Sequence, residues 1–249
     1  MILILLPDSD YDPTEAALPW AALRNAGIDV RFATPTGAIA HADMRLTDQG
    51  FSLLSPVLMT RSTALDVYER MTRDPQFTSP MAYADVRDDE VSGVFVPGGH
   101  APGMKSMLDS ALAQEIFSRS ILSGRPTGAV CHGVLLAARA RNPETGHSVL
   151  YERHTTAVTA LLELSAWNLT RLWLGRYYRT YPATVQAEVT AALKNSEHFR
   201  RGPLVPRRDS TTHLHRGFTV VDGNYISARW PGDCHRLATE YRDLVISLT

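Results

Sequence analysis

Short apolar runs alternate with segments of helical periodicity over the first third of the chain. Residues 2–6 form a continuous apolar run, which is typical of a parallel strand covered on both faces. Residues 12–15 (Asp-Pro-Thr-Glu) then begin a predicted helix with an acidic N-cap and a proline at its first position, and Gly27 ends it. Residues 29–34 read as the next strand. This β-α-β order is typical of a parallel α/β sheet.

The same pattern continues to the end of the chain. Further strands are predicted at 91–96, 126–130 and 153–159, and a hairpin over 218–228 turns at Asp222-Gly223. Further helices are predicted at 109–122, 132–141 and 234–247. A glycine-rich loop, Pro97-Gly98-Gly99-His100-Ala101-Pro102-Gly103, follows the strand at 91–96. These elements predict an α/β fold in which helices sandwich a parallel, flavodoxin-like sheet.

Two segments interrupt the regular alternation. Residues 40–90 and 161–215 do not fit the repeating pattern, and the second reads as helix in two pieces broken near Pro182, with several aromatic residues. The chain has no fixed-period repeat, no low-complexity tract and no Gly/Ser linker. We therefore expect one domain over residues 1–249 that carries two insertions.

Composition and charge narrow the function class. Lys and Arg together number 25 and Asp and Glu 26, so a net charge of −1 gives no long-range attraction to nucleic acid or to an anionic membrane. Two cysteines are too few for a disulfide framework, which favours a reducing compartment. The N-terminus lacks the basic start and long apolar core of a signal peptide, and no apolar run could span a membrane. We expect a cytoplasmic protein.

The sharpest chemical feature is Ala129-Val130-Cys131-His132-Gly133. An apolar strand ends at Cys131 and a helix begins at once, with small residues two positions to either side, which is the layout of a nucleophile elbow. A thiol beside a helix N-terminus is expected to have a lowered pKa. The plainer alternative is a buried small hydrophobic residue. The backbone N–H of His132 faces the position where an oxyanion would form, and the loop after 91–96 could supply a second donor.

Glu15 has two competing interpretations. It lies three residues after Asp12 and could complete a capping box at the helix start. However, the first helix of a parallel sheet begins at the same edge at which Cys131 is expected, so its carboxylate could instead exchange a proton with the thiol. The spacing alone leaves both roles open.

These motifs together resemble the DJ-1/PfpI superfamily, which is also described as class I glutamine amidotransferase-like. The resemblance covers roughly residues 1–160 and 217–249, and the insertions are more similar to the larger Hsp31-type branch. It implies that Cys131 is the reactive cysteine, that Glu15 hydrogen-bonds it, that His132 is the adjacent histidine, and that the N–H groups of Gly99 and His132 form an oxyanion hole.

The sequence also departs from the family pattern. Hsp31-like members complete a Cys-His-acid triad after the following strand, but here the nearest acid is Glu163, about one helical turn too far. A Cys131–Glu15 pair is therefore the safer prediction. Glutamine amidotransfer is not expected, because His132 abuts the cysteine and no synthetase domain follows. We expect no cofactor and no metal, since His213 and His215 lack companions with ligand spacing.

Two functional hypotheses follow. The first is a cysteine-dependent enzyme acting on a small carbonyl or amide-like substrate, which by resemblance includes glyoxalase III-like conversion of methylglyoxal to lactate, or a hydrolase. The second is a non-catalytic stress-response, redox-sensing or chaperone protein that uses the same cysteine. We predict that the insertion at 161–200 caps the site, with His100, Tyr178 and Tyr181 as candidate substrate-lining residues. Alternatively, its aromatic residues bury the interface of the homodimer that we expect.

Overall fold

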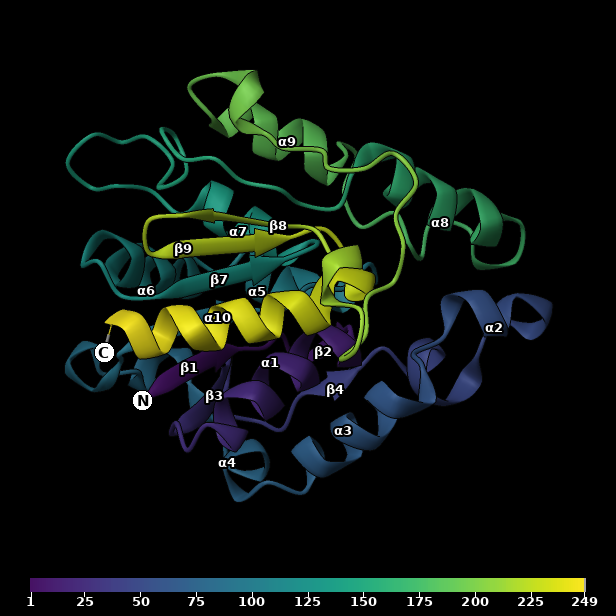
Figure 1. Cartoon of the computed structure of the whole chain (residues 1–249), viewed down its shortest axis with the longest axis horizontal. Helices are drawn as coiled ribbons and strands as arrows, with labels where there is room; N and C mark the ends of the chain where they lie inside the picture. Colours follow the sequence, from purple (N-terminus) through teal and green to yellow (C-terminus); the bar gives the residue numbers. More distant parts are fainter. Residues whose placement is uncertain (249) are drawn as a thin grey trace.

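A seven-stranded sheet forms the centre of the molecule (Figure 1). The computed structural model describes residues 1–248. The strands are ordered β5-β3-β1-β6-β7-β9-β8, and each neighbouring pair is parallel except the β8–β9 hairpin. Their bounds are β1 Ile2–Leu5, β3 Val30–Thr34, β5 Met81–Ala82, β6 Gly93–Val96, β7 Thr127–Val130, β8 Thr219–Asp222 and β9 Tyr225–Ala228. The predicted fold class is confirmed.

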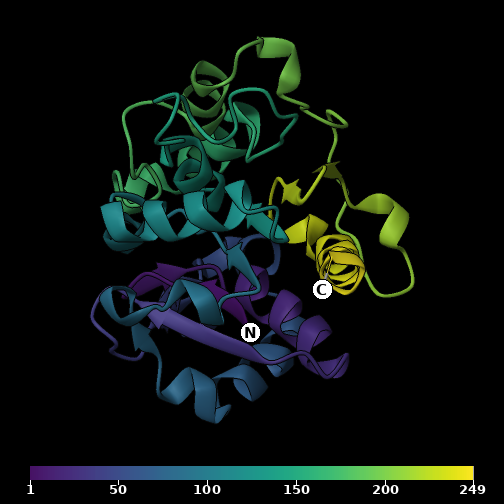
Figure 2. The same cartoon turned by 90° about the vertical axis from the view of Figure 1, so that its left-hand side faces the viewer.

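The order of the strands places the helices on two faces. The chain leaves β1 in one direction to reach β3, and leaves β6 in the opposite direction to reach β7. Since such crossovers are right-handed, their helices lie on opposite faces of the sheet. Helix α1 (Pro13–Asn25) packs on one face between α3 (Ser62–Thr72) and α10 (Cys234–Leu248). Helices α5 (Lys105–Leu108), α6 (Ala111–Leu122) and α7 (Gly133–Arg139) pack together on the other (Figures 1 and 2).

The central strands are apolar because both of their faces are covered. Every residue of β1, β6 and β7 is buried, and the main hydrophobic cluster extends from Ile2 to Val245. The continuous apolar run at the start of the chain is therefore explained by its position in the middle of the sheet.

The two irregular segments add further elements around the sheet. The first contains α2 (Ser55–Leu58), α3, α4 (Pro75–Thr78) and the edge strand β5. It also holds β4 (His41–Ala42), which pairs with β2 (Ser9–Tyr11) in a small second sheet that the sequence did not predict. The second contains α8 (Ala160–Leu174) and α9 (Val185–Ala192), and Figure 1 shows both on the β8–β9 side of the molecule.

The strand predicted at 153–159 is not formed. The only bridge in this segment joins Thr155 to Phe199. The sheet position beside β9 is taken by β8, and the segment instead packs through side chains: the Thr156 N–H donates to Ser227 Oγ at 2.9 Å. The β-branched residues of this segment favour a strand, but β8 occupies the place beside β9, so the segment adds no strand to the sheet.

Among residues 1–248, no helix combines the length and the apolar character that crossing a bilayer requires.

Candidate active site

Cys131 lies at a sharp turn between β7 and α7. Its backbone φ is +56°, a left-handed conformation that costs energy for a residue with a side chain and that is typical of a nucleophile elbow. Gly133 is small for a steric reason: a Cβ on it would lie 2.6 Å from the carbonyl oxygens of Val96 and Pro97. The predicted elbow is therefore confirmed. Cys131 itself has no exposed surface.

Glu15 reaches the same place from the first turn of α1. Its Oε2 accepts a 2.8 Å hydrogen bond from the Gly98 N–H, and the carboxyl neighbours the Cys131 thiol. Asp12 caps the helix alone, through bonds from the Thr14 and Glu15 N–H groups, while its own N–H donates to the Gly98 carbonyl. The capping box is therefore not closed by Glu15, and its carboxyl faces the thiol. The second oxygen, Oε1, is buried with no hydrogen-bond partner of standard geometry among residues 1–248.

The thiol does not have the lowered pKa that its position at a helix start predicted. Burial raises the pKa of Cys131 well above its ordinary value, and the nearby charges of Glu15 and Asp12 raise it further, against a smaller lowering by the His132 N–H. Burial likewise raises the pKa of Glu15 well above that of a solvated carboxyl, with the charge of Asp12 as the next cause. The resting thiol is therefore protonated at neutral pH.

Two neutral imidazoles lie beside the thiol. His132 Nδ1 is 3.6 Å from Cys131 Sγ, and the His100 ring packs edge-on against His132 with centroids 4.5 Å apart. Burial, with the positive charges of Arg179 and Arg139 and the neighbouring His100, lowers the pKa of His132 well below its usual value. Burial lowers the pKa of His100 to about 4. Both rings are therefore uncharged at pH 7 and can accept a proton.

The two predicted oxyanion-hole donors are available. Neither the Gly99 N–H nor the His132 N–H donates to an oxygen atom in the described part of the chain. Gly98 and Gly99 must lack side chains here, because a Cβ on Gly98 would lie 2.7 Å from the His132 nitrogen and one on Gly99 would lie 2.4 Å from the Asp10 carbonyl oxygen. The glycine pair thus allows two loops to approach the thiol closely.

Glu163 does not join His132. Its Oε1 accepts a 2.5 Å bond from Arg179 and its Oε2 a 2.8 Å bond from the Val185 N–H. The Glu163 carboxyl is buried, and no hydrogen bond within residues 1–248 connects it to the imidazole. It ties α8 to the start of α9, since one oxygen bonds to Arg179 in the connecting segment and the other to the first residue of α9.

The two tyrosines predicted to line the substrate site lie in different places. Tyr178 lines a cavity beside His100, and its hydroxyl donates to Asp43 at 2.6 Å. Tyr181 does not line that cavity: its hydroxyl bonds to Asp109 at 2.6 Å, and Arg139 lies over its ring at 4.3 Å. Tyr181 thus packs against α7, because a salt-bridged arginine there offers both a cation for the ring and a donor for the hydroxyl.

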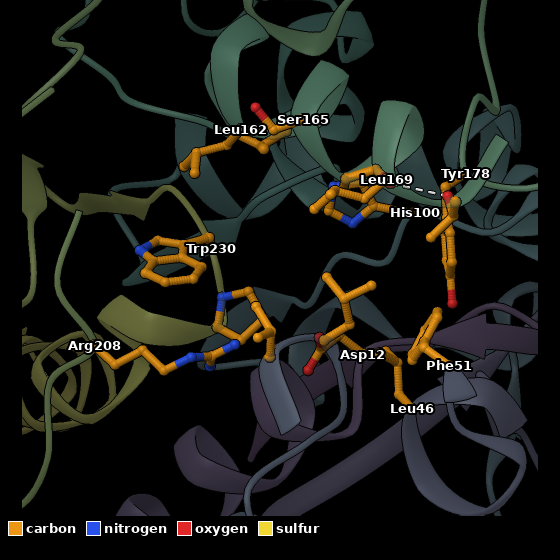
Figure 3. Close-up of a pocket in the computed structure, with 16 residues that line it drawn as sticks. Asp12, Leu46, Phe51, His100, Leu162, Ser165, Leu169, Tyr178, Arg208 and Trp230 are labelled. Atoms are coloured by element: carbon orange, nitrogen blue, oxygen red, sulfur yellow. Dashed lines mark hydrogen bonds between the residues drawn. The ribbon is translucent and has the colours of Figure 1, made fainter. Parts of the chain in front are cut away.

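Figure 3 shows the cavity, whose volume is about 200 Å³. Both irregular segments contribute to it, so the predicted cap is formed in part by α8, whereas α9 packs against α7. Several polar and aromatic residues that line the cavity were not predicted from the sequence. Arg208 and Trp230 carried no signal of a binding role, and Asp12 was predicted only as the N-cap of a helix. The lining residues are Asp12, Leu46, Phe51, Val57, Leu58, His100, Val158, Leu162, Ser165, Ala166, Leu169, Thr170, Tyr178, Arg208, Trp230 and Pro231.

One group of side chains has the chemistry of a metal site. The ligand atoms of His100, Cys131 and His132 all lie within 4.8 Å of one another, and thiolate with imidazole is a donor set that suits Zn²⁺. His213 and His215, by contrast, have ring centroids 6.0 Å apart on an exposed loop, where His213 bonds to Ser210 and Thr212.

Comparison with known proteins agrees with this geometry. The family model described as ThiJ/PfpI family-like matches residues 6–203. The chain belongs to the ThiJ/PfpI family. An uncharacterized protein of Schizosaccharomyces pombe is 35% identical over 128 residues, which cover 50% of this chain and 47% of that protein. The glutathione-independent glyoxalase hsp3102 of the same yeast is 26% identical over 156 residues, 58% of each chain. The chain thus spans about half the length of these two relatives.

One solved structure extends the similarity of fold to nearly the whole chain. Glyoxalase III from Candida albicans superposes with a TM-score of 0.70 at 17% identity, over 99% of this chain and 96% of that one. The fold of the two proteins is therefore shared.

Proposed function

We propose that this protein is a cysteine-dependent enzyme that converts a small 2-oxoaldehyde to the corresponding 2-hydroxy acid. The observation that carries the proposal is the placement of Cys131 between two proton-accepting groups, the Glu15 carboxyl and His132 Nδ1, at a strained elbow. Two relatives named as glyoxalases support the same reaction class.

The first step forms a carbon–sulfur bond. Cys131 Sγ adds to the aldehyde carbon while its S–H proton passes to the neutral His132 imidazole. Negative charge then develops on the aldehyde oxygen, where the N–H groups of Gly99 and His132 stabilise it until it takes up that proton. Because the resting thiol is protonated, this step needs the imidazole as a base, and the lowered pKa of His132 keeps it neutral for that purpose.

The second step moves hydrogen between the two carbons. The ionised Glu15 carboxylate removes the proton from the former aldehyde carbon, and the resulting enediol is reprotonated at the neighbouring carbon to give a thioester. Water then cleaves the carbon–sulfur bond, and the sulfur recovers its proton. The aldehyde carbon is oxidised to an acid, the ketone carbon is reduced to an alcohol, and one water is consumed, so no external oxidant or reductant enters.

His100 controls how a substrate reaches the thiol. It lines the cavity, whereas Cys131 and His132 lie behind it with almost no exposed surface. A substrate in the cavity therefore meets the sulfur when the His100 side chain turns away from His132. A neutral ring makes this movement less costly than a charged one, since no buried charge is relocated.

The test is turnover of methylglyoxal by the purified protein, with lactate measured as product. We expect Cys131→Ala to abolish turnover and Cys234→Ala to leave it unchanged, because Cys234 is buried at the start of α10 and bonds to the Trp230 carbonyl. In D₂O, the lactate should carry deuterium at C2. Lactate formation by the Cys131 variant at the wild-type rate, or no lactate from either protein, would refute the proposal.

A further inference from the structure

The cavity beside His100 is larger than a methyl group requires. We propose that it binds an aryl group, so that the preferred substrate is an aryl 2-oxoaldehyde such as phenylglyoxal rather than methylglyoxal. This inference rests on the proposed function for the chemistry and on the cavity alone for the size and nature of the group. The reaction follows the same steps: phenylglyoxal and water give mandelate, with one carbon oxidised and its neighbour reduced.

The volume of the cavity matches an aromatic ring. It measures about 200 Å³, whereas a cavity of about 150 Å³ lined by aliphatic and aromatic side chains already accommodates benzene. A methyl group would leave most of this space to water against apolar walls, which forgoes the free energy of burying apolar surface. The size therefore favours a ring over a methyl group.

The walls of the cavity are apolar on two sides. Helix α8 contributes Leu162, Ala166 and Leu169, and the first irregular segment contributes Leu46 and Phe51. In Figure 3, Leu162 lies above a central open space, and Leu46 and Phe51 lie below it. A planar group entering from the surface would thus contact aliphatic carbon on both of its faces.

The two ends of the cavity are different. His100 and Tyr178 lie at one end, where His100 approaches the thiol, and the Trp230 indole lies opposite them (Figure 3). The 2-oxoaldehyde group must be at the His100 end to reach Cys131, so the remainder of the substrate extends toward Trp230. An aromatic ring there gains favourable ring–ring contacts that an alkyl chain lacks.

A charged wall limits the length of the group. Arg208 lies over the Trp230 ring at 4.7 Å, and within residues 1–248 it has no hydrogen bond or ion pair at contact distance, although Asp12 attracts it electrostatically. Figure 3 shows its guanidinium and the Asp12 carboxyl pointing toward each other at this side of the cavity. A long hydrocarbon chain would strip water from both groups, which is unfavourable. The cavity therefore selects a compact ring.

The first experiment compares kcat/KM for phenylglyoxal and methylglyoxal. We expect the wild-type ratio to favour phenylglyoxal by about 10-fold or more, the scale that apolar pockets reach. Ala166→Phe fills the cavity and should lower the ratio about 10-fold. Leu172→Phe is the matched control, because Leu172 lies on the same helix with 92% of its surface exposed, and it should leave the ratio unchanged. A ratio that favours methylglyoxal in the wild type would overturn the inference.

The second experiment measures binding without turnover. Acetophenone, an unreactive aryl ketone, is added to Cys131→Ala protein, and saturation-transfer NMR should detect contact that Ala166→Phe removes in the same background. Binding without any turnover by the wild-type enzyme would refute the proposed function while supporting the aryl-binding cavity. Methylglyoxal turnover without acetophenone binding would refute the cavity inference and leave the proposed function intact.

Discussion

The Gly98 N–H donates a 2.8 Å hydrogen bond to Oε2 of Glu15, across 83 residues of sequence. This bond holds a buried carboxyl from α1 at the end of β6, beside the thiol at the end of β7. Because the strands are parallel, their carboxyl ends meet at one edge, and residues from three distant parts of the chain share one small volume. The helix keeps its cap from Asp12, so Glu15 is free for chemistry.

Replacing Glu15 with Gln separates its chemistry from its structural role. We expect kcat to fall about 10²–10⁴-fold, the usual size of a general acid–base contribution, because the amide can still accept from Gly98 but cannot take a proton. The unfolding midpoint should change little, since Asp12 continues to cap α1. Steady-state kinetics with thermal unfolding as control checks this, and a kcat within twofold of wild type would exclude Glu15 as the base.

The charge on Glu15 also affects the thiol. Since that charge is a cause of the raised Cys131 pKa, we expect iodoacetamide labelling of the native protein to report a thiol pKa above the ordinary value of about 8.5. Glu15→Gln should move this pKa downward. The rate of labelling against pH, followed by mass spectrometry of the Cys131 peptide, measures both values. A wild-type value below 8.5 would contradict the burial argument.

A buried ion pair anchors the turn that carries Trp230. Arg229 makes two 2.9 Å bonds to Asp233, and both side chains are almost completely buried. Arg229→Met should lower the free energy of unfolding by about 3–5 kcal/mol, because it leaves an uncompensated carboxylate inside the protein. Arg242→Met, which removes the exposed pair with Asp243, should cost at most about 1 kcal/mol. Urea unfolding of the two variants tests the difference, and equal losses would contradict it.

The lowered pKa of His100 predicts a stability change with pH. The unfolded chain takes up a proton on this imidazole below a pH of about 6.5, whereas the folded protein does so only near 4. His100 therefore stabilises the fold fully above pH 6.5, and this contribution falls as the pH drops toward 4, by about 2 kcal/mol at pH 5. Urea unfolding at pH 7.5 and 5 should show a smaller loss in His100→Asn than in wild type. The same loss in both proteins would contradict the prediction.

Features that depend on neighbouring residues could be predicted from the sequence, whereas features that depend on contacts between distant residues could not. The elbow at Cys131 follows from adjacent residues, since an apolar strand, a cysteine and a glycine suffice to specify the turn. The raised thiol pKa could not be predicted in this way, because Asp12 and Glu15 reach the sulfur only through the order of the strands. The helix start at Gly133 was visible in the sequence, but the burial and charge that outweigh it were not.

Two other differences between the predicted and the observed structure arise from contacts between residues distant in sequence. Residues 153–159 have the side chains of a strand, but β8 occupies the position beside β9. The loop around Arg208 is mostly exposed. The Arg208 side chain nevertheless turns inward, because it can stack on the Trp230 ring. In both cases the outcome depends on a partner distant in sequence. The residues that line the cavity were the hardest to predict, because they too come together from distant parts of the sequence.

Under the proposed function, the enclosure of Cys131 acts as a size filter. Its sulfur has no surface in contact with solvent, and the cavity next to it holds a molecule about as large as a substituted benzene. The peptide bonds and modified side chains of a folded protein are attached to a body far too large to follow them past α8 and His100. For the proposed reaction, selection by size would precede chemical recognition and would favour free metabolites over groups attached to a folded protein.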